Sequence, residues 1–182
     1  MTESIEHLSK DEANELFRLY KFFIQEADRC KEAKAYHAGS VMLGSALEAI
    51  LVLFVDMYPE ESLATGECHK RDKKILPLLK WDLSHLLSVA KSAGWLPNAL
   101  DHDEDEWDEE KAKIGDYAQL IHDVRNYVHP GRHTREFYKE DITEEFYSQL
   151  SEVLEYCQKW LEAHNAKALL KALDKEEKNG DE

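Results

Sequence analysis

The chain has 182 residues, of which 34% are charged and 43% hydrophobic, and its formal net charge is −15. A chain of this length fits one domain and buries enough surface to fold without a disulfide or a structural metal. The negative charge argues against binding along duplex DNA, because neutralisation of phosphates by basic side chains supplies most of that affinity. A small local basic site is still compatible with this composition.

The scarcity of turn-forming residues indicates the fold class. Seven glycines and four prolines punctuate the sequence, which favours an all-α protein of a few long helices. The three cysteines, Cys30, Cys68 and Cys157, form no CxxC pair, so we expect buried, reduced thiols. The polar, acidic start of the chain is unlike a signal peptide, and the expected location is cytoplasmic.

The first two helices are predicted from capping and periodicity. Ser9 and Glu12 have the spacing of a capping box, which predicts a helix start. Steps of three and four residues give this helix one apolar face, formed by Leu16, Leu19, Tyr20, Phe23, Ile24 and Ala27. The second helix, about Tyr36 to Met57, is apolar nearly all round. We therefore predict that it lies buried at the centre of the bundle.

This apolar segment raises the question of a membrane span. Residues Ala35 to Val55 are about long enough to cross a bilayer. Glu48 lies in the second half of the segment, and His37 lies near its start. A carboxylate in the middle of a membrane costs about 2.5–3.5 kcal/mol, and the other helices have apolar stripes that need a common partner. We favour a buried central helix, with a membrane span as the alternative.

The next segment is predicted as a connector followed by a third helix. Pro59 is expected to end the second helix, and residues 63–74 have the composition of a polar connector. Pro77 separates a short element from the following helix. Asp82 is the predicted N-cap of that helix, and Gly94 suits a left-handed closing position.

No metal or cofactor is predicted. Asp101–Glu110 is acidic at every position except two and contains no glycine, whereas a calcium loop needs alternating oxygen ligands and a glycine at its sharp turn. We favour a solvated acidic loop before a helix, with a divalent cation site as the alternative. His37, His69 and His85 lack ligand spacing and are interpreted as surface or core residues.

Two further helices complete the predicted bundle. The fourth runs from about Asp108 to Val128, with a core face of Ile114, Ala118, Ile121, Val124 and Val128. The fifth starts near Asp141 and carries the apolar stripe Ile142, Phe146, Leu150, Val153, Cys157, Trp160 and Leu161. We assign residues 1–164 to a single helical domain. Residues 165–182 are assigned to a helical extension with a disordered tail.

The end of the fourth helix concentrates polar side chains. His122, Arg125, Asn126 and His129 follow one another at steps of three and four and so share a helix face. The guanidinium of Arg125 has a fixed set of donors suited to a phosphate, and His129 titrates near neutral pH. Capping of the last helical turn by Arg125 and His129 is the alternative interpretation. Glu48, the lone carboxylate of the apolar helix, is predicted to pair with Arg125, because a buried charge needs a partner.

Three segments resemble the HEPN superfamily of helical domains (higher eukaryotes and prokaryotes nucleotide-binding). They are the apolar helix His37–Asp56 around Glu48, the helix and turn Trp81–Pro97, and the sequence RNYVHPGR at Arg125–Arg132. The resemblance implies a HEPN-like bundle of about five helices that acts as a homodimer. Active family members are metal-independent endoribonucleases in prokaryotic toxin, defence and stress systems.

The resemblance also implies roles for individual residues. Arg125 would steady the scissile phosphate, Asn126 would position groups at the helix end, and His129 would assist attack by the ribose 2′-hydroxyl. The supporting residues would be Glu48, His122, Tyr127, Arg132 and His133. No metal and no cofactor would take part.

The spacing within this sequence departs from the catalytic family pattern. Only Asn126, Tyr127 and Val128 separate Arg125 from His129, which is shorter than in catalytic members. Two functions therefore stay open: a ribonuclease, and a catalytically inactive module for dimerisation, interaction or nucleotide binding. The expected partners are a second copy of the chain, RNA or a nucleotide at a local basic site, and a further protein. Duplex DNA and membranes are not expected partners.

Overall fold

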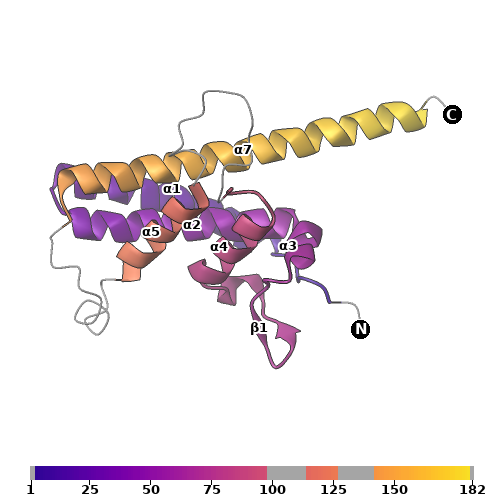
Figure 1. Cartoon of the computed structure of the whole chain (residues 1–182), viewed down its shortest axis with the longest axis horizontal. Coiled ribbons are helices and arrows are strands. Elements are labelled where there is room, and N and C mark those ends of the chain that lie inside the picture. The colour runs from indigo at the N-terminus through magenta and orange to yellow at the C-terminus, as the bar shows by residue number, and fades with distance from the viewer. Residues whose placement is uncertain (1–2, 98–113, 127–141, 181–182) are drawn as a thin grey trace.

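The structure is a computed structural model that describes residues 3–97, 114–126 and 142–180. Within these ranges the chain is all-α, as predicted (Figure 1). The helices are α1 (Lys10–Glu32), α2 (Tyr36–Met57), α3 (Pro59–Thr65), α4 (Leu83–Ser92), α5 (Ile114–Asn126) and α7 (Glu144–Gly180). A small antiparallel hairpin joins β1 (Lys70–Arg71) to β2 (Lys74–Ile75), and Leu78–Lys80 forms a 3₁₀ turn.

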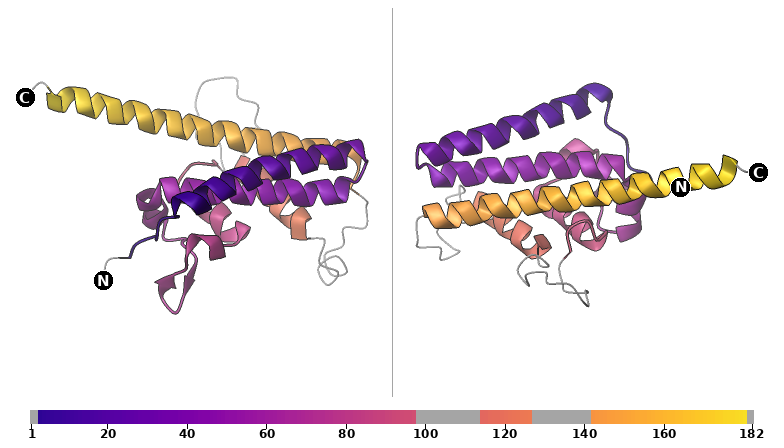
Figure 2. Two further views of the ribbon diagram at one scale, coloured as in Figure 1. Left: turned by 180° about the vertical axis from the view of Figure 1, so that it is seen from behind. Right: turned by 90° about the horizontal axis from the view of Figure 1, so that it is seen from above.

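The helix α2 lies at the centre of the fold, as its all-round apolar sequence predicts. It contacts each of the other described helices. In Figure 2, α1, α2 and α7 lie side by side in one layer with α2 in the middle. The shorter helices α4 and α5 pack against α2 from below in the view of Figure 1. Leu47, Leu51 and Val55 of α2 are fully buried, so this helix forms the core that the other helices cover.

Burial also bears on the membrane alternative for α2. Among the described residues, Tyr36–Met57 is the one helix whose length and hydropathy would allow it to cross a bilayer. Its most apolar window is 61% buried inside the protein. The other helices thus cover most of the apolar surface of α2 that lipid would otherwise cover. A mostly buried helix of this kind is compatible with the core helix of a soluble protein.

The predicted helix caps are present. The Ser9 side chain accepts a hydrogen bond from the Glu12 amide, and the Glu12 carboxylate accepts one from the Ser9 amide. The Ser9 hydroxyl also donates to the Glu12 carboxylate, at 2.7 Å. This side-chain bond, followed by the bond from the Ser9 amide, lowers the pKa of Glu12. Asp82 caps α4 by accepting from the His85 amide at 3.0 Å. Gly94 follows α4 with φ of 74°, a left-handed angle that suits glycine.

The polar connector over residues 63–74 contains regular structure that the sequence analysis did not predict: the end of α3, the strand β1 and the start of β2. Pro59 begins α3 instead of simply ending α2, because proline suits the first turn of a helix, where its missing N–H is not needed. The hairpin of β1 and β2 then turns at Asp72 and Lys73, which both have positive φ. A two-residue hairpin turn of the primed type requires such angles.

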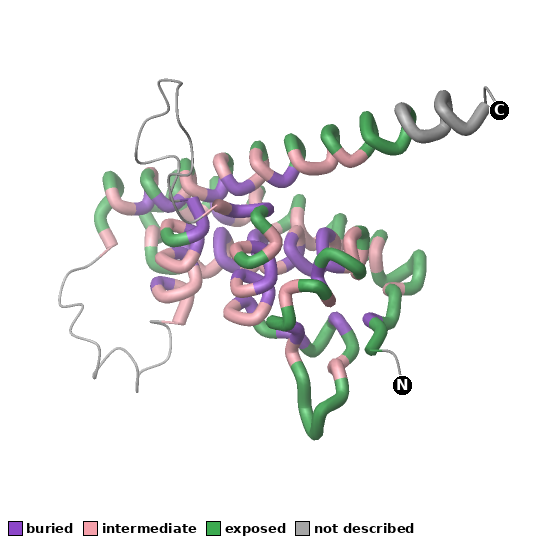
Figure 3. Tube along the Cα trace, turned by 45° about the vertical axis from the view of Figure 1, so that its right-hand side comes forward, coloured by how far each residue is buried: buried purple, intermediate pink, exposed green. Residues whose placement is uncertain are grey.

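Two helices form the remaining part of the fold. The predicted core face of α5 is buried at Ile114, Ala118, Ile121 and Val124. The start of the predicted fourth helix, Val128 and the acidic stretch Asp101–Glu110 lie outside the described residues. The helix α7 continues without a break past residue 164 to Gly180. From residue 166 to residue 173 most of its side chains are exposed (Figure 3), among them Leu169, Leu170 and Leu173.

Candidate functional site

The candidate site lies where the last turn of α5 crosses α2. Because Ile121 and Val124 point into the core, helical geometry places His122, Arg125 and Asn126 at the edge of that buried face. All three side chains are partly buried. The site is therefore built on two helices that the core holds in place.

Gly44 determines how closely Arg125 approaches α2. A Cβ atom at Gly44 would lie 2.8 Å from Cδ and 3.1 Å from Cβ of Arg125. The glycine thus leaves the space through which the aliphatic part of Arg125 crosses the surface of α2. Glu48 follows Gly44 by one helical turn and so lies where the guanidinium ends.

Arg125 and Glu48 form an ion pair, with Arg125 Nη1 donating to Glu48 Oε2. This contact confirms the predicted pairing. The two side chains are 31% and 28% exposed, so the pair is half-buried, whereas the sequence indicated a buried carboxylate. A guanidinium has five N–H donors, and within the described part of the chain Glu48 is the one hydrogen-bond partner of Arg125. The other donors of this guanidinium are thus engaged by no residue of the described part of the chain.

His122 connects Asn126 to two further side chains of α5. Its Nε2 lies 3.0 Å from Asn126 Nδ2, and its Nδ1 lies 3.0 Å from Asp123 Oδ1. Gln119 Nε2 lies 2.9 Å from the same Nδ1, so this ring nitrogen faces both an amide donor and a carboxylate acceptor. Gln119 Nε2 also donates to Asp123 Oδ1, at 3.2 Å. His122 therefore positions Asn126, and both of its ring nitrogens are engaged.

A cavity of about 390 Å³ opens beside this group of side chains. Its lining is drawn from α2, from the start of α4 and from α5, and comprises Val41, Ser45, Glu48, Asp82, Leu83, His122, Arg125 and Asn126. Burial alone would raise the pKa of Asp82, but hydrogen bonds from Ser84 and His85 outweigh it and lower this pKa. The cavity thus contains an ionised Asp82 in addition to the Glu48–Arg125 pair.

The structure brings together four of the residues that the sequence singled out: Arg125, Asn126, His122 and Glu48. The others, Tyr127, His129, Arg132 and His133, lie outside the described residues. The contribution of Asp82 to the lining was not predicted, because its position at the start of α4 indicated only a helix cap. A capping carboxylate lies at the helix end, and the sequence alone does not show which other helices approach it there.

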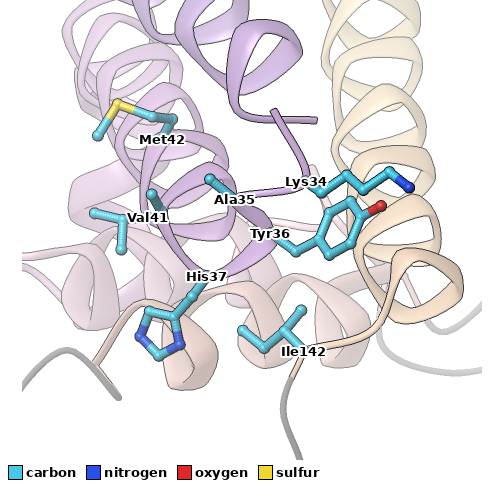
Figure 4. A pocket seen from close by; sticks show the side chains of 8 residues that line it. Lys34, Ala35, Tyr36, His37, Val41, Met42 and Ile142 are labelled. Atoms are coloured by element: carbon cyan, nitrogen blue, oxygen red, sulfur yellow. The ribbon is translucent and has the colours of Figure 1, made fainter. Parts of the chain in front are cut away.

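A second cavity, of about 610 Å³, lies at the start of α2 (Figure 4). It is lined mainly by apolar side chains, including Val41, Met42 and Ile142, together with the ring of His37. Tyr36 closes one side, where its hydroxyl donates to Glu144 Oε2 at 3.0 Å. Val41 lines both cavities, so the first half of α2 has hollows on two sides.

Comparison with known proteins adds no further information on the site, since no protein-family model, no curated protein and no solved structure matches this chain. The functional interpretation therefore depends on the residues and geometry described above.

Proposed function

We propose that this chain is a HEPN-like helical protein that acts as a homodimer and cleaves RNA without a metal ion at the end of α5. The observation that carries the proposal is the convergence of Arg125, Asn126 and His122 on one open cavity. This convergence occurs directly before the remaining residues of the sequence RNYVHPGR. The setting we propose is a prokaryotic defence, toxin or stress system in the cytoplasm.

The roles follow from the chemistry of the side chains. The donors of Arg125 that Glu48 does not engage would bind a phosphate oxygen of the RNA backbone. Asn126, held by His122 through its Nδ2, would present its side-chain oxygen to the ribose or to His129. His129 would take the proton of the ribose 2′-hydroxyl, and the attack of that oxygen on phosphorus would leave a cyclic phosphate. The bond to the 5′-oxygen of the next nucleotide breaks in this step, and that oxygen takes up a proton from water.

Dimer formation is part of the proposal. The exposed leucines of α7 beyond the bundle, Leu169, Leu170 and Leu173, form an apolar surface that a second copy would cover. Light scattering on the purified protein measures the mass directly. A mass of one chain at all concentrations would contradict the dimer.

The second candidate function is a non-catalytic interaction or nucleotide-binding module. The observation that favours it is the Glu48–Arg125 ion pair, because a guanidinium already neutralised by a carboxylate attracts a phosphate less strongly. In this case Arg125 would stabilise the fold, and RNA would remain intact.

Labelled RNA incubated with the protein in EDTA distinguishes the two functions. The Arg125→Gln variant removes the cation but leaves Glu48 without its partner, which is destabilising by less than the roughly 3–5 kcal/mol of a fully buried pair. The double variant Glu48→Gln with Arg125→Gln removes both charges and replaces the ion pair with two neutral amides. Arg18→Gln is the matched control, since Arg18 is exposed on α1 and pairs with Glu15.

The ribonuclease proposal expects cleavage by the wild type and by Arg18→Gln, and loss of cleavage in Arg125→Gln, in the double variant and in His129→Ala. Thermal melting should show that the double variant is more stable than Arg125→Gln. Cleavage that persists in all variants would exclude this site. Absence of cleavage by every sample would favour the interaction module, which RNA and nucleotide binding measured by fluorescence anisotropy would then test.

A further inference from the structure

A cluster of metal-ligating side chains lies between the β-hairpin and α4. It consists of His69, directly before β1, with Asp82 and His85 at the start of α4. One potential ligand atom from each residue lies within 4.8 Å of the other two. The sequence spacing gave no sign of this cluster, because the chain brings His69 and His85 together only across the intervening hairpin and 3₁₀ turn.

The two imidazole rings are stacked. Their centroids are 3.8 Å apart, and the rings are nearly parallel, at 6°. Nδ1 of His69 is buried and has no hydrogen-bond partner within the described part of the chain. Leaving a buried polar atom without a partner has a free-energy cost. Binding of a cation by this nitrogen would remove that cost.

Asp82 is arranged to complete a site with the two histidines. Its Oδ1 accepts hydrogen bonds from the Ser84 hydroxyl, the His85 amide and His85 Nδ1, at 2.6, 3.0 and 2.8 Å. The last of these bonds holds Nδ1 of His85 beside Asp82 Oδ1, so an ion that displaces the proton between these two atoms would bind both of them. Oδ2 of Asp82 has no hydrogen bond to another described residue.

We propose that His69, Asp82 and His85 bind a divalent transition-metal ion, with Zn²⁺ as the reference ion. Two imidazoles and one carboxylate form a ligand set suited to such ions and poorly suited to Mg²⁺ or Ca²⁺, which prefer oxygen ligands. Three protein ligands leave a coordination position for water or another molecule. The side chains of Asp82 and His85 are 57% and 37% exposed, so an ion can reach the site. Because ring lone pairs lie in the ring planes, the stacked imidazoles open away from parallel when they bind one ion.

The proposed metal site adjoins the cavity at the end of α5. Asp82 also lines the cavity that contains Arg125, where Glu48 and Asp82 bring two carboxylates against one guanidinium. An ion bound at Asp82 would add positive charge at the rim of the cavity and favour an anionic ligand there. The metal proposal itself does not depend on the ribonuclease function, because that function is tested in EDTA and metal binding is tested without RNA.

Isothermal titration of the untagged, EDTA-dialysed protein with ZnCl₂ tests the proposal. We expect one saturable site per chain, abolished in His69→Ala and in His85→Ala. His37→Ala is the matched control, because His37 is exposed outside the cluster, and it should bind Zn²⁺ as the wild type does. Asp82→Asn keeps a good N-cap but removes the negative charge. It should weaken binding by more than about tenfold, since even residues outside the ligand set typically contribute roughly 10–100-fold.

A second measurement keeps the test valid if a histidine variant does not fold. Long-range ¹H–¹⁵N spectra of the wild type report on each imidazole nitrogen, and the signals of His69 and His85 should shift on addition of Zn²⁺ while that of His37 does not. A melting temperature that rises with Zn²⁺ in the wild type and in His37→Ala, but not in His69→Ala, would agree. Equal binding by all variants, or no saturable binding by the folded wild type, would overturn the proposal.

Discussion

The two halves of α2 contact their neighbours in different ways. In the second half, Phe54 packs edge-on against Trp95, with ring centroids 4.9 Å apart, and other aromatic rings surround this pair. In the first half, Gly39 and Gly44 lie against the side chains of Tyr147 and Arg125. Both cavities border this first half, and the Glu48–Arg125 pair lies where the two halves meet.

This difference shows what the small residues of α2 provide. A glycine inside a helix is less favourable than alanine by about 1 kcal/mol, so two glycines reduce the intrinsic stability of the first half. Because these glycines have no side chain, the ring of Tyr147 and the side chain of Arg125 can lie against the backbone of α2. The second half of α2 therefore serves stability, and the first half accommodates polar groups from α5 and α7.

The largest effect is expected in the apolar half. Phe54→Ala should lower the free energy of unfolding by about 3–5 kcal/mol, because it leaves a cavity among large side chains. Urea unfolding followed by circular dichroism measures this change. At a temperature where the variant is folded, its RNA cleavage or binding should equal that of the wild type. A loss below 1 kcal/mol would contradict the assignment of this half to stability.

The glycines should respond differently from each other. A Cβ atom at Gly39 would lie 2.5 Å from Cε2 of the buried Tyr147 ring, so Gly39→Ala forces a rigid group to move and should cost about 1–3 kcal/mol. At Gly44 the new Cβ meets the flexible Arg125 side chain. Gly44→Ala should therefore change stability by less than about 1 kcal/mol, since the gain in helix propensity offsets the clash. It should still displace Arg125 from Glu48 and impair the site. Equal losses of stability in both variants would contradict the comparison.

Tyr147 gives the first half of α2 a measurable pH dependence. Burial, aided by the nearby charge of Asp28, raises the pKa of Tyr147 from its usual value near 10 to about 12. A tyrosine with a raised folded-state pKa contributes stability that is present below pH 10 and is lost as the pH rises through 12. Tyr147→Phe should cost about 1 kcal/mol at neutral pH, because it removes the hydrogen bond to the Ala27 carbonyl.

Denaturation of the two proteins between pH 9 and 12 isolates this contribution. The difference between their free energies of unfolding should decrease as the pH rises. The wild type then loses the stability contributed by the protonated Tyr147 hydroxyl, which the variant lacks. A difference that stays constant over this range would show that Tyr147 does not titrate as described.

The smallest expected effect lies in the hairpin, away from α2. Lys73 adopts φ of 63°, an angle that strains a residue with a Cβ atom and suits glycine. Lys73→Gly should raise the free energy of unfolding by roughly 0.5–1 kcal/mol and leave RNA and Zn²⁺ binding unchanged. A loss of stability in thermal melts would show that the Lys73 side chain contributes more than its backbone strain costs.

Local signals in the sequence predicted most of the fold. The Ser9 capping box, the Asp82 cap and the apolar period of α5 each depend on neighbouring residues, and all three are confirmed. The Glu48–Arg125 pair was also predictable, because a lone carboxylate in an apolar helix needs a cation. The helix α3 was missed because Pro59 both ends one helix and begins the next.

The clustering of His69 with His85 was not predictable from sequence spacing. These residues lie on separate elements, and only the path of the hairpin and the 3₁₀ turn brings their rings together. The same reason explains why the place of Asp82 in the cavity was missed. Contacts set by tertiary structure leave no periodic signal in the sequence.

The most direct test of the proposed function is the rate of RNA cleavage in EDTA by the double variant Glu48→Gln with Arg125→Gln, compared with Arg18→Gln. The variants should fold equally well, and we expect cleavage by Arg18→Gln alone. Cleavage at the same rate by both proteins would show that the end of α5 is not the catalytic site.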